Sequence, residues 1–64
     1  MDKQTIDTIK SCIDQHRITI EELKRKRSEI YAQGLDRLAE TITGQIIYEQ
    51  EAISQLVRRL SSDS

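Results

Sequence analysis

Apolar residues recur at alternating spacings of three and four along nearly the whole chain, with one break in the series at Gly34. This period is typical of helices that pack one face against another helix, whereas side chains in a strand alternate every two residues. The first series is Ile6, Ile9, Ile13, Ile20, Leu23 and Ile30, with His16 and Arg27 at its polar positions. The second series is Leu35, Ala39, Ile42, Ile46, Glu49, Ile53, Leu56 and Leu60. The pattern predicts an all-α chain built from two coiled-coil-like helices.

The segment QGLD joins the two series and has the composition of a helix stop followed by a helix start. Gly34 suits the left-handed position after a helix, Leu35 the apolar contact that follows it, and Asp36 the cap of the next helix. So short a connection forces the helices to be antiparallel. We therefore expect one helical-hairpin domain over residues 1–64, with helices at about 2–33 and 36–61 and a turn at 34–36.

The start and the middle of the predicted first helix contain further signals, and so does the end of the chain. Asp2 can cap its first turn. Around Thr19, β-branched residues cluster and Glu22 completes the spacing of a capping box, so a break of the helix near Thr19 stays open. The heptad register nevertheless continues through this point, which favours one uninterrupted helix. At the other end of the chain, SSDS is expected to fray.

Polar residues interrupt three layers of the predicted interface. Arg27 and Glu49 are about two turns apart in the hairpin register, so a second chain is the expected source of partner charges that set orientation. Exposure of both at the rim of the interface is the alternative. Protonation of His16 on acidification is expected to loosen the packing. The layers are Ile30 with Ala39, Arg27 with Ile42, Leu23 with Ile46, Ile20 with Glu49, His16 with Ile53, Ile13 with Leu56, and Ile9 with Leu60.

The length of the chain calls for a partner. A chain of 64 residues buries a small fraction of its surface, and Cys12, its one cysteine, excludes an intrachain disulfide. We therefore favour a homodimer that forms a four-helix bundle, or binding to another protein. No apolar stretch suits a membrane span or a signal peptide, so we expect a soluble cytoplasmic protein with no membrane partner.

Four consecutive cations, Lys24 to Arg27, form the strongest charge cluster of the sequence. Together with Arg17, the residues Lys24, Arg25 and Lys26 are candidates for contact with nucleic acid. The net charge is −1, the second helix is acidic and aromatic residues for stacking on bases are scarce. We therefore interpret the run as a solvated end of the first helix that complements the helix dipole, and we do not expect nucleic acid as a partner.

Cys12 and His16 lie four residues apart and so share a helix face, a geometry that suits two metal ligands or a thiolate–imidazole pair. One such pair per chain is too few for a metal site, and a lone cysteine beside a helix interface is usually a small buried hydrophobe. We expect no metal, no cofactor and no catalytic residues.

Several apolar residues fall outside the heptad positions. Ile18, Ile47 and Tyr48 point away from the predicted interface, and Gly44 lies one turn before the last two. Glycine inside a helix costs about 1 kcal/mol relative to alanine and often marks close approach of another backbone. With Leu38, Ala52 and Val57 on the flanks, the second helix has more apolar surface than one neighbour can cover. We expect Gly44, Ile47, Tyr48, Ile18 and Val57 to contact a partner.

Three groups of small helical hairpins are similar in layout. Length, short turn and number of heptad layers resemble the Rop family, which implies an RNA-binding four-helix bundle as an alternative function. The stretch IEELKRKRSEIYAQGL and Gln45 resemble the sporulation phosphatases, but GQIIY departs from their signature SQELD at Gly44 and Tyr48, so that activity is not expected. Type III secretion co-chaperones are similar in size, which implies a chain that orders on its client.

From these features we expect a small non-enzymatic protein–protein interaction module, acting as a regulator, adaptor or inhibitor in a bacterium, plasmid or phage. Its mechanism would be the packing of helix against helix, driven by burial of apolar surface. The RNA-binding bundle and the co-chaperone are the alternatives.

Overall fold

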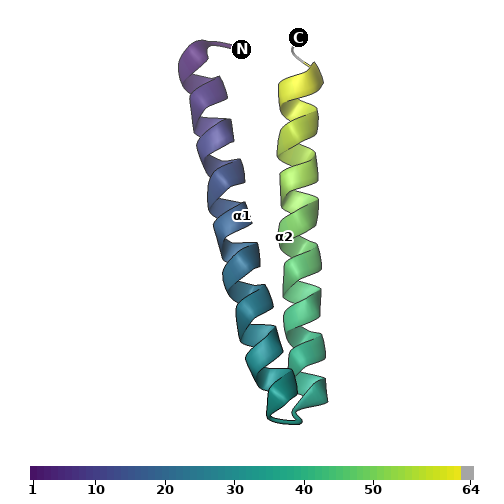
Figure 1. The fold of residues 1–64 in the computed structure, drawn as a ribbon. Coiled ribbons are helices and arrows are strands. Elements are labelled where there is room, and N and C mark those ends of the chain that lie inside the picture. The colour runs from purple at the N-terminus through teal and green to yellow at the C-terminus, as the bar shows by residue number, and fades with distance from the viewer. Residues whose placement is uncertain (63–64) are drawn as a thin grey trace.

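The computed structural model describes residues 1–62, which form an antiparallel hairpin of two helices (Figure 1). α1 spans Lys3–Ala32 and α2 spans Asp36–Ser62. The hairpin is elongated, with extents of 48 × 15 × 10 Å. Its helices pack against each other, which confirms the all-α hairpin expected from the sequence. Asp63 and Ser64, the last two residues of the predicted domain and of the tail expected to fray, lie outside the described residues.

α1 begins at the predicted cap and continues without a break. The Asp2 carboxylate accepts a hydrogen bond of 2.7 Å from the Thr5 backbone N–H, and this bond lowers the pKa of the Asp2 carboxyl below its usual range. At Thr19, where a break was left open, the hydroxyl donates to the Gln15 carbonyl at 3.1 Å within the helix. Such a bond belongs to a helix interior, so Thr19 does not cap a new helix.

The turn closes α1 with the paired hydrogen bonds of a Schellman motif. Gly34 has a φ of 79°, in the left-handed region that glycine adopts most readily. Its N–H donates to the Tyr31 carbonyl at 2.9 Å, and the Leu35 N–H donates to the Ile30 carbonyl at 3.2 Å. The left-handed position predicted for Gly34 is confirmed.

Two details of the turn differ from expectation. Asp36 is the first residue of α2 and does not cap it, because the Leu35 carbonyl accepts the first helical hydrogen bond, from the Ala39 N–H at 3.1 Å. The Asp36 carboxylate still complements the positive end of the helix dipole. Leu35 was expected to open the second apolar series, but its side chain is half exposed, so buried packing on α2 begins at Ala39.

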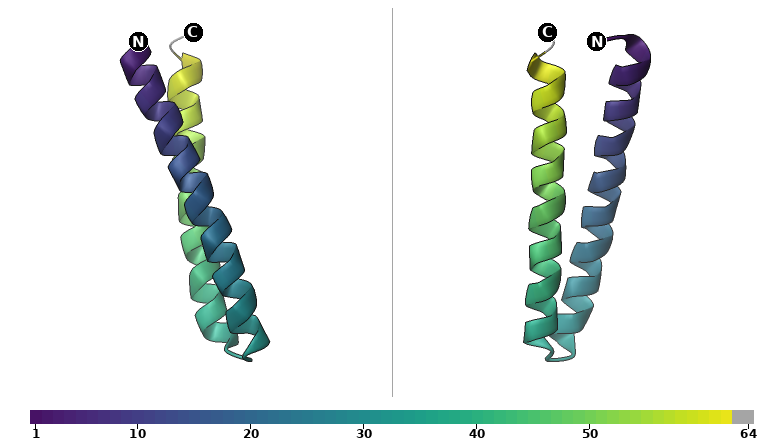
Figure 2. Two further views of the ribbon diagram at one scale, coloured as in Figure 1. Left: turned by 60° about the vertical axis from the view of Figure 1, so that its left-hand side comes forward. Right: turned by 180° about the vertical axis from the view of Figure 1, so that it is seen from behind.

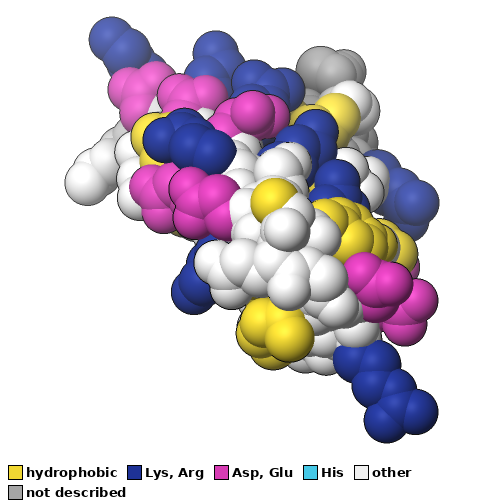
Figure 3. Space-filling view, turned by 60° about the horizontal axis from the view of Figure 1, so that its bottom comes forward, with side chains coloured by type: hydrophobic (Ala, Val, Ile, Leu, Met, Phe, Trp, Pro, Cys, Tyr) yellow, Lys and Arg dark blue, Asp and Glu magenta, His cyan; other side chains and the backbone are white. Residues whose placement is uncertain are grey.

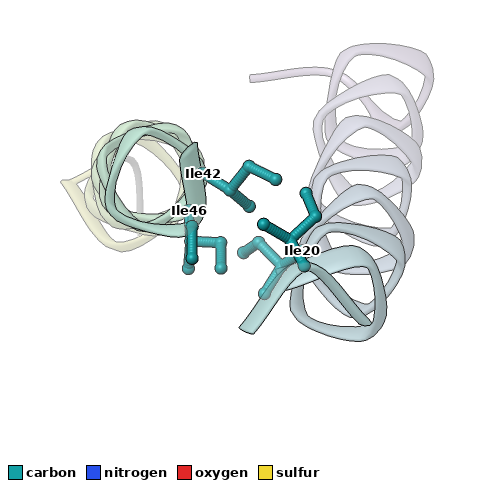
Figure 4. Close-up of a cluster of buried hydrophobic side chains, with 5 residues drawn as sticks. Ile20, Ile42 and Ile46 are labelled. Carbon is teal, nitrogen blue, oxygen red and sulfur yellow. The ribbon is translucent and has the colours of Figure 1, made fainter. Parts of the chain in front are cut away.

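Buried apolar residues occur along both halves of the hairpin, since Ile9 and Ile13 are buried in the open half, but the contiguous core cluster lies near the turn. Figure 4 shows Ile20 of α1 directed toward Ile42 and Ile46 of α2. The helices lie closest near the turn and diverge toward the termini (Figures 1 and 2), where Leu56 and Leu60 stay only partly buried. The core cluster consists of Ile20, Ile30, Ala39, Ile42 and Ile46, with Leu23 and Ile53 packed against it.

Within residues 1–62, neither helix has a segment long and apolar enough to cross a membrane.

Candidate functional site

His16 and Glu49 form a polar contact between the two helices. His16 Nδ1 and Glu49 Oε2 are hydrogen-bonded, and the side chains retain 32% and 20% of their exposure. An ionised carboxylate only accepts hydrogen bonds, so Nδ1 carries the proton. Sequence reasoning placed the two residues in adjacent layers, one facing Ile53 and the other facing Ile20, and missed their pairing. The signal for this pairing in the sequence was the presence of two long polar side chains in adjacent layers of the interface.

Arg27 also has a partner within the chain. Its Nη1 donates to the Thr43 hydroxyl at 3.1 Å, and that hydroxyl lies 3.3 Å from the Ala39 carbonyl, to which it donates. The sequence left the partners of Arg27 and Glu49 to a second chain or to solvent. Both residues instead contact the opposite helix of the same hairpin, so no second chain is required to pair them.

The basic run does not form one cationic surface. Lys24, Arg25 and Lys26 are exposed, but successive residues of a helix point about 100° apart, and Arg27 turns toward α2. Lys24 lies 3.8 Å from Glu21, and Arg17 lies 3.9 Å from Asp14, so carboxylates accompany these cations. The expected complement between this run and the helix dipole is wrong, because the last turn of α1 contains no basic residue.

The predicted partner-contact residues are exposed but do not share one surface. Tyr48 is 72% exposed, and Ile47 is 50% exposed beside it on the outer side of α2, together with Gly44. Ile18 is 51% exposed on the outer side of α1, where its neighbours are charged residues of the same helix. Val57 lies almost three turns beyond Ile47 along α2. The structure therefore brings together Gly44, Ile47 and Tyr48 and leaves Ile18 and Val57 apart.

Gly44 is helical and borders open space. A Cβ placed at Gly44 would meet no other atom within 4 Å. The hairpin therefore does not need glycine at this position for its own packing, although glycine weakens the helix by about 1 kcal/mol relative to alanine.

Seen from the turn end, hydrophobic side chains form separate patches between basic and acidic ones (Figure 3).

Shallow grooves follow one side of the hairpin between the helices. Gln45 lines a groove of about 450 Å³ in the turn half, Ala52 and Arg59 line one of about 300 Å³, and Arg59 also lines one of about 580 Å³ at the open end. Gln45, Ala52 and Arg59 are spaced seven residues apart, so they lie along one line of α2. On α1 the matching line contains Thr5 and Thr19, each at a groove.

Cys12 lies between Thr5 and Thr19 on the same line of α1. We call this side of the hairpin the groove face and define it by Thr5, Cys12 and Thr19 on α1 with Gln45, Ala52 and Arg59 on α2. Sequence reasoning followed the heptad positions of the interface and missed this face. This face could have been predicted by following the positions that flank the interface at intervals of seven residues.

Cys12 is exposed, which contradicts its interpretation as a buried hydrophobe. Its neighbour His16 uses Nδ1 to bind Glu49. Within residues 1–62, no group of three or more His, Cys, Asp and Glu side chains is placed to hold a metal ion.

The chain was compared with protein families, curated proteins and solved structures. No family model, no curated protein and no solved structure matches it.

Proposed function

We propose that the chain is a small non-enzymatic interaction module that binds protein by packing the outer side of α2 against a partner. The observation that carries the proposal is the surface formed by Gly44, Ile47 and Tyr48, where two large apolar side chains flank a glycine that borders open space. A helix of the partner can approach the α2 backbone closely at Gly44, because no Cβ stands in the way.

The energetics of this surface suit binding. Full burial of a large apolar side chain contributes about 1.5–3 kcal/mol, and Ile47 and Tyr48 retain half or more of their exposure. Tyrosine is also among the residues that dominate binding energy at protein interfaces, since it combines a large apolar ring with a polar tip. Since association itself costs at least several kcal/mol, these two anchors beside a glycine would form the centre of a larger contact.

The polar contacts between the helices have a supporting role in this proposal. The sequence suggested that Arg27 and Glu49 set the orientation of a partner. Since Arg27 contacts Thr43 and Glu49 contacts His16, we assign them to fixing the register of the hairpin that presents the α2 surface.

The module would act as a regulator, adaptor or inhibitor that covers part of its partner's surface. Its size, short turn and layered interface are similar in layout to small bacterial and plasmid hairpins, and we place it in the cytoplasm of a bacterium or phage-infected cell. RNA binding through Arg17, Lys24, Arg25 and Lys26 is the alternative, and it requires binding that weakens steeply with salt.

Photo-crosslinking tests the proposal. Tyr48 is replaced by a photoreactive phenylalanine analogue in the cells that make the protein, and Ser28, exposed on α1, receives the same analogue as the matched control. We expect a light-dependent adduct from position 48 that protease removes and ribonuclease leaves intact, with none from position 28. An adduct removed by ribonuclease would assign the surface to RNA, and absence of any adduct at position 48 would overturn the proposal.

A further inference from the structure

We propose that a second copy of this chain covers the groove face, so that two hairpins pair through it around a two-fold axis. The inference rests on the proposed function and names the partner of part of the same surface, since Gly44 and Tyr48 line the groove beside Gln45. Ile47 lies next to Tyr48 on the outer side of α2 but does not line this groove, and neither does Val57, so both stay outside this interface.

Charge distribution distinguishes the groove face from the opposite flank of the hairpin. Between Thr5 and Thr19, the α1 residues directed to the groove face are uncharged, and α2 contributes uncharged Gln45, Ala52 and Gln55. The charged residues of α2 at these grooves are Glu49, which is hydrogen-bonded to His16, and Arg59 near the open end. In a two-fold interface both copies use the same surface, and residues near the axis meet their own copy, so a face with few charges pairs with itself more easily than a face with many. The opposite flank of α1 presents the charged residues Asp7, Lys10, Asp14, Arg17, Glu21 and Lys24.

The exposed area of the hairpin matches the requirement of a dimer. Its accessible surface is 5001 Å², whereas a compact monomer of 7.4 kDa would expose roughly 4,200 Å². The excess is close to the roughly 800 Å² that each partner buries in a standard protein interface. Pairing through one long face would remove this excess.

The shape of the groove face also suits a second hairpin. Grooves run from the open end to the turn half, and their lining includes the small or flexible side chains of Thr5, Thr19, Gln45 and Ala52. In the open half Ile9 and Ile13 of α1 are buried, whereas Leu56 of α2 lines a groove and is only partly buried. Side chains of a second copy placed in this groove would cover Leu56.

Sedimentation equilibrium of two charge variants tests the inference. Gln45→Glu with Gln55→Glu adds two negative charges to the groove face of each copy, and Gln50→Glu with Ser54→Glu adds the same charge to the opposite side of α2, where both residues are exposed. Like charges across an interface cost several kcal/mol. We expect the first pair to raise the dimer Kd by about 100-fold and the control pair to leave it nearly unchanged. Equal effects of both pairs, or no effect of either, would overturn the inference.

Cys12 provides a second readout in the natural chain, since it is exposed in the single hairpin and lies on the groove face. We expect its reaction with a thiol reagent to slow as the protein is concentrated, while a cysteine at Ser28 in a Cys12→Ser background keeps its rate. A chain that is monomeric at all concentrations, with equal thiol rates, would overturn the dimer. The proposed function would survive that result if position 48 still crosslinks to a different protein, so the two failures are distinguishable.

Discussion

His16 of α1 and Glu49 of α2 are hydrogen-bonded through Nδ1 and Oε2 near the middle of the hairpin, between the core cluster and the diverging ends of the helices. The contact links residues 33 positions apart in the sequence. A slide of one helix past the other by a turn would separate the imidazole from the carboxylate and leave both partly buried groups without this partner. The pair therefore supports, in the middle of the hairpin, the register that the short turn at Gly34 sets.

Removal of the Glu49 carboxylate tests this role. We expect Glu49→Ala to lower the free energy of unfolding by about 1 kcal/mol, since both groups are partly exposed and solvent weakens the pair. Glu51→Ala, on the exposed side of the same helix, is the control and should change stability by less than about 0.5 kcal/mol. Urea unfolding of Glu49→Ala, of His16→Ala and of the variant with both changes gives the coupling free energy between the two side chains. Glu51→Ala is measured in the same way. Additive single effects would show that the contact does not stabilise the hairpin.

Asp2 makes the stability of the hairpin depend on pH in the acid range. The hydrogen bond from the Thr5 N–H lowers the pKa of Asp2 in the folded chain, so its stabilising effect is present above the pKa of the unfolded chain. That effect is lost as pH falls through the lowered value, below about pH 4. Asp2→Asn keeps an accepting oxygen without titrating and should flatten this part of the Tm profile. If the Tm of the natural chain and the Tm of Asp2→Asn fell identically with acid pH, this stabilising role of the Asp2 carboxylate would be contradicted.

The two glycines should respond to alanine in opposite ways. Gly44→Ala introduces a methyl into open space and removes the helix penalty, so we expect a gain of about 1 kcal/mol in folding of the single hairpin and weaker partner binding. Gly34→Ala places a side chain at a φ of 79° and should lose about 1 kcal/mol or more. Urea unfolding at low protein concentration measures both changes. Destabilisation by Gly44→Ala would show that the chain itself needs this glycine.

Much of the fold follows from local rules. The period of the apolar residues predicts both helices, Asp2 predicts the start of α1, and the need for a left-handed residue identifies Gly34 as the turn. Each of these signals depends only on neighbouring residues. The position of Asp36 relative to the first hydrogen bond of α2 was missed, because helix ends shift by one residue without changing the pattern.

The site was harder to predict, because it depends on how the helices are placed relative to each other. His16 and Glu49 reach diagonally across one turn, which a layer diagram of facing residues does not represent. Cys12 is exposed since it flanks the interface in the half where the helices diverge. The exposure of Tyr48 was predicted, but its place beside a groove depends on Thr19 and Leu23 of the other helix.

The most direct test of the central claim, that this hairpin works by packing helices against a protein partner, is the solution mass of the unmodified chain. Sedimentation equilibrium over a wide concentration range, with helicity recorded on the same samples, measures it. We predict a helical species of twice the 7.4 kDa chain mass that dissociates on dilution with some loss of helicity. A fully helical monomer at every concentration, with no protein crosslinked at position 48, would contradict the account.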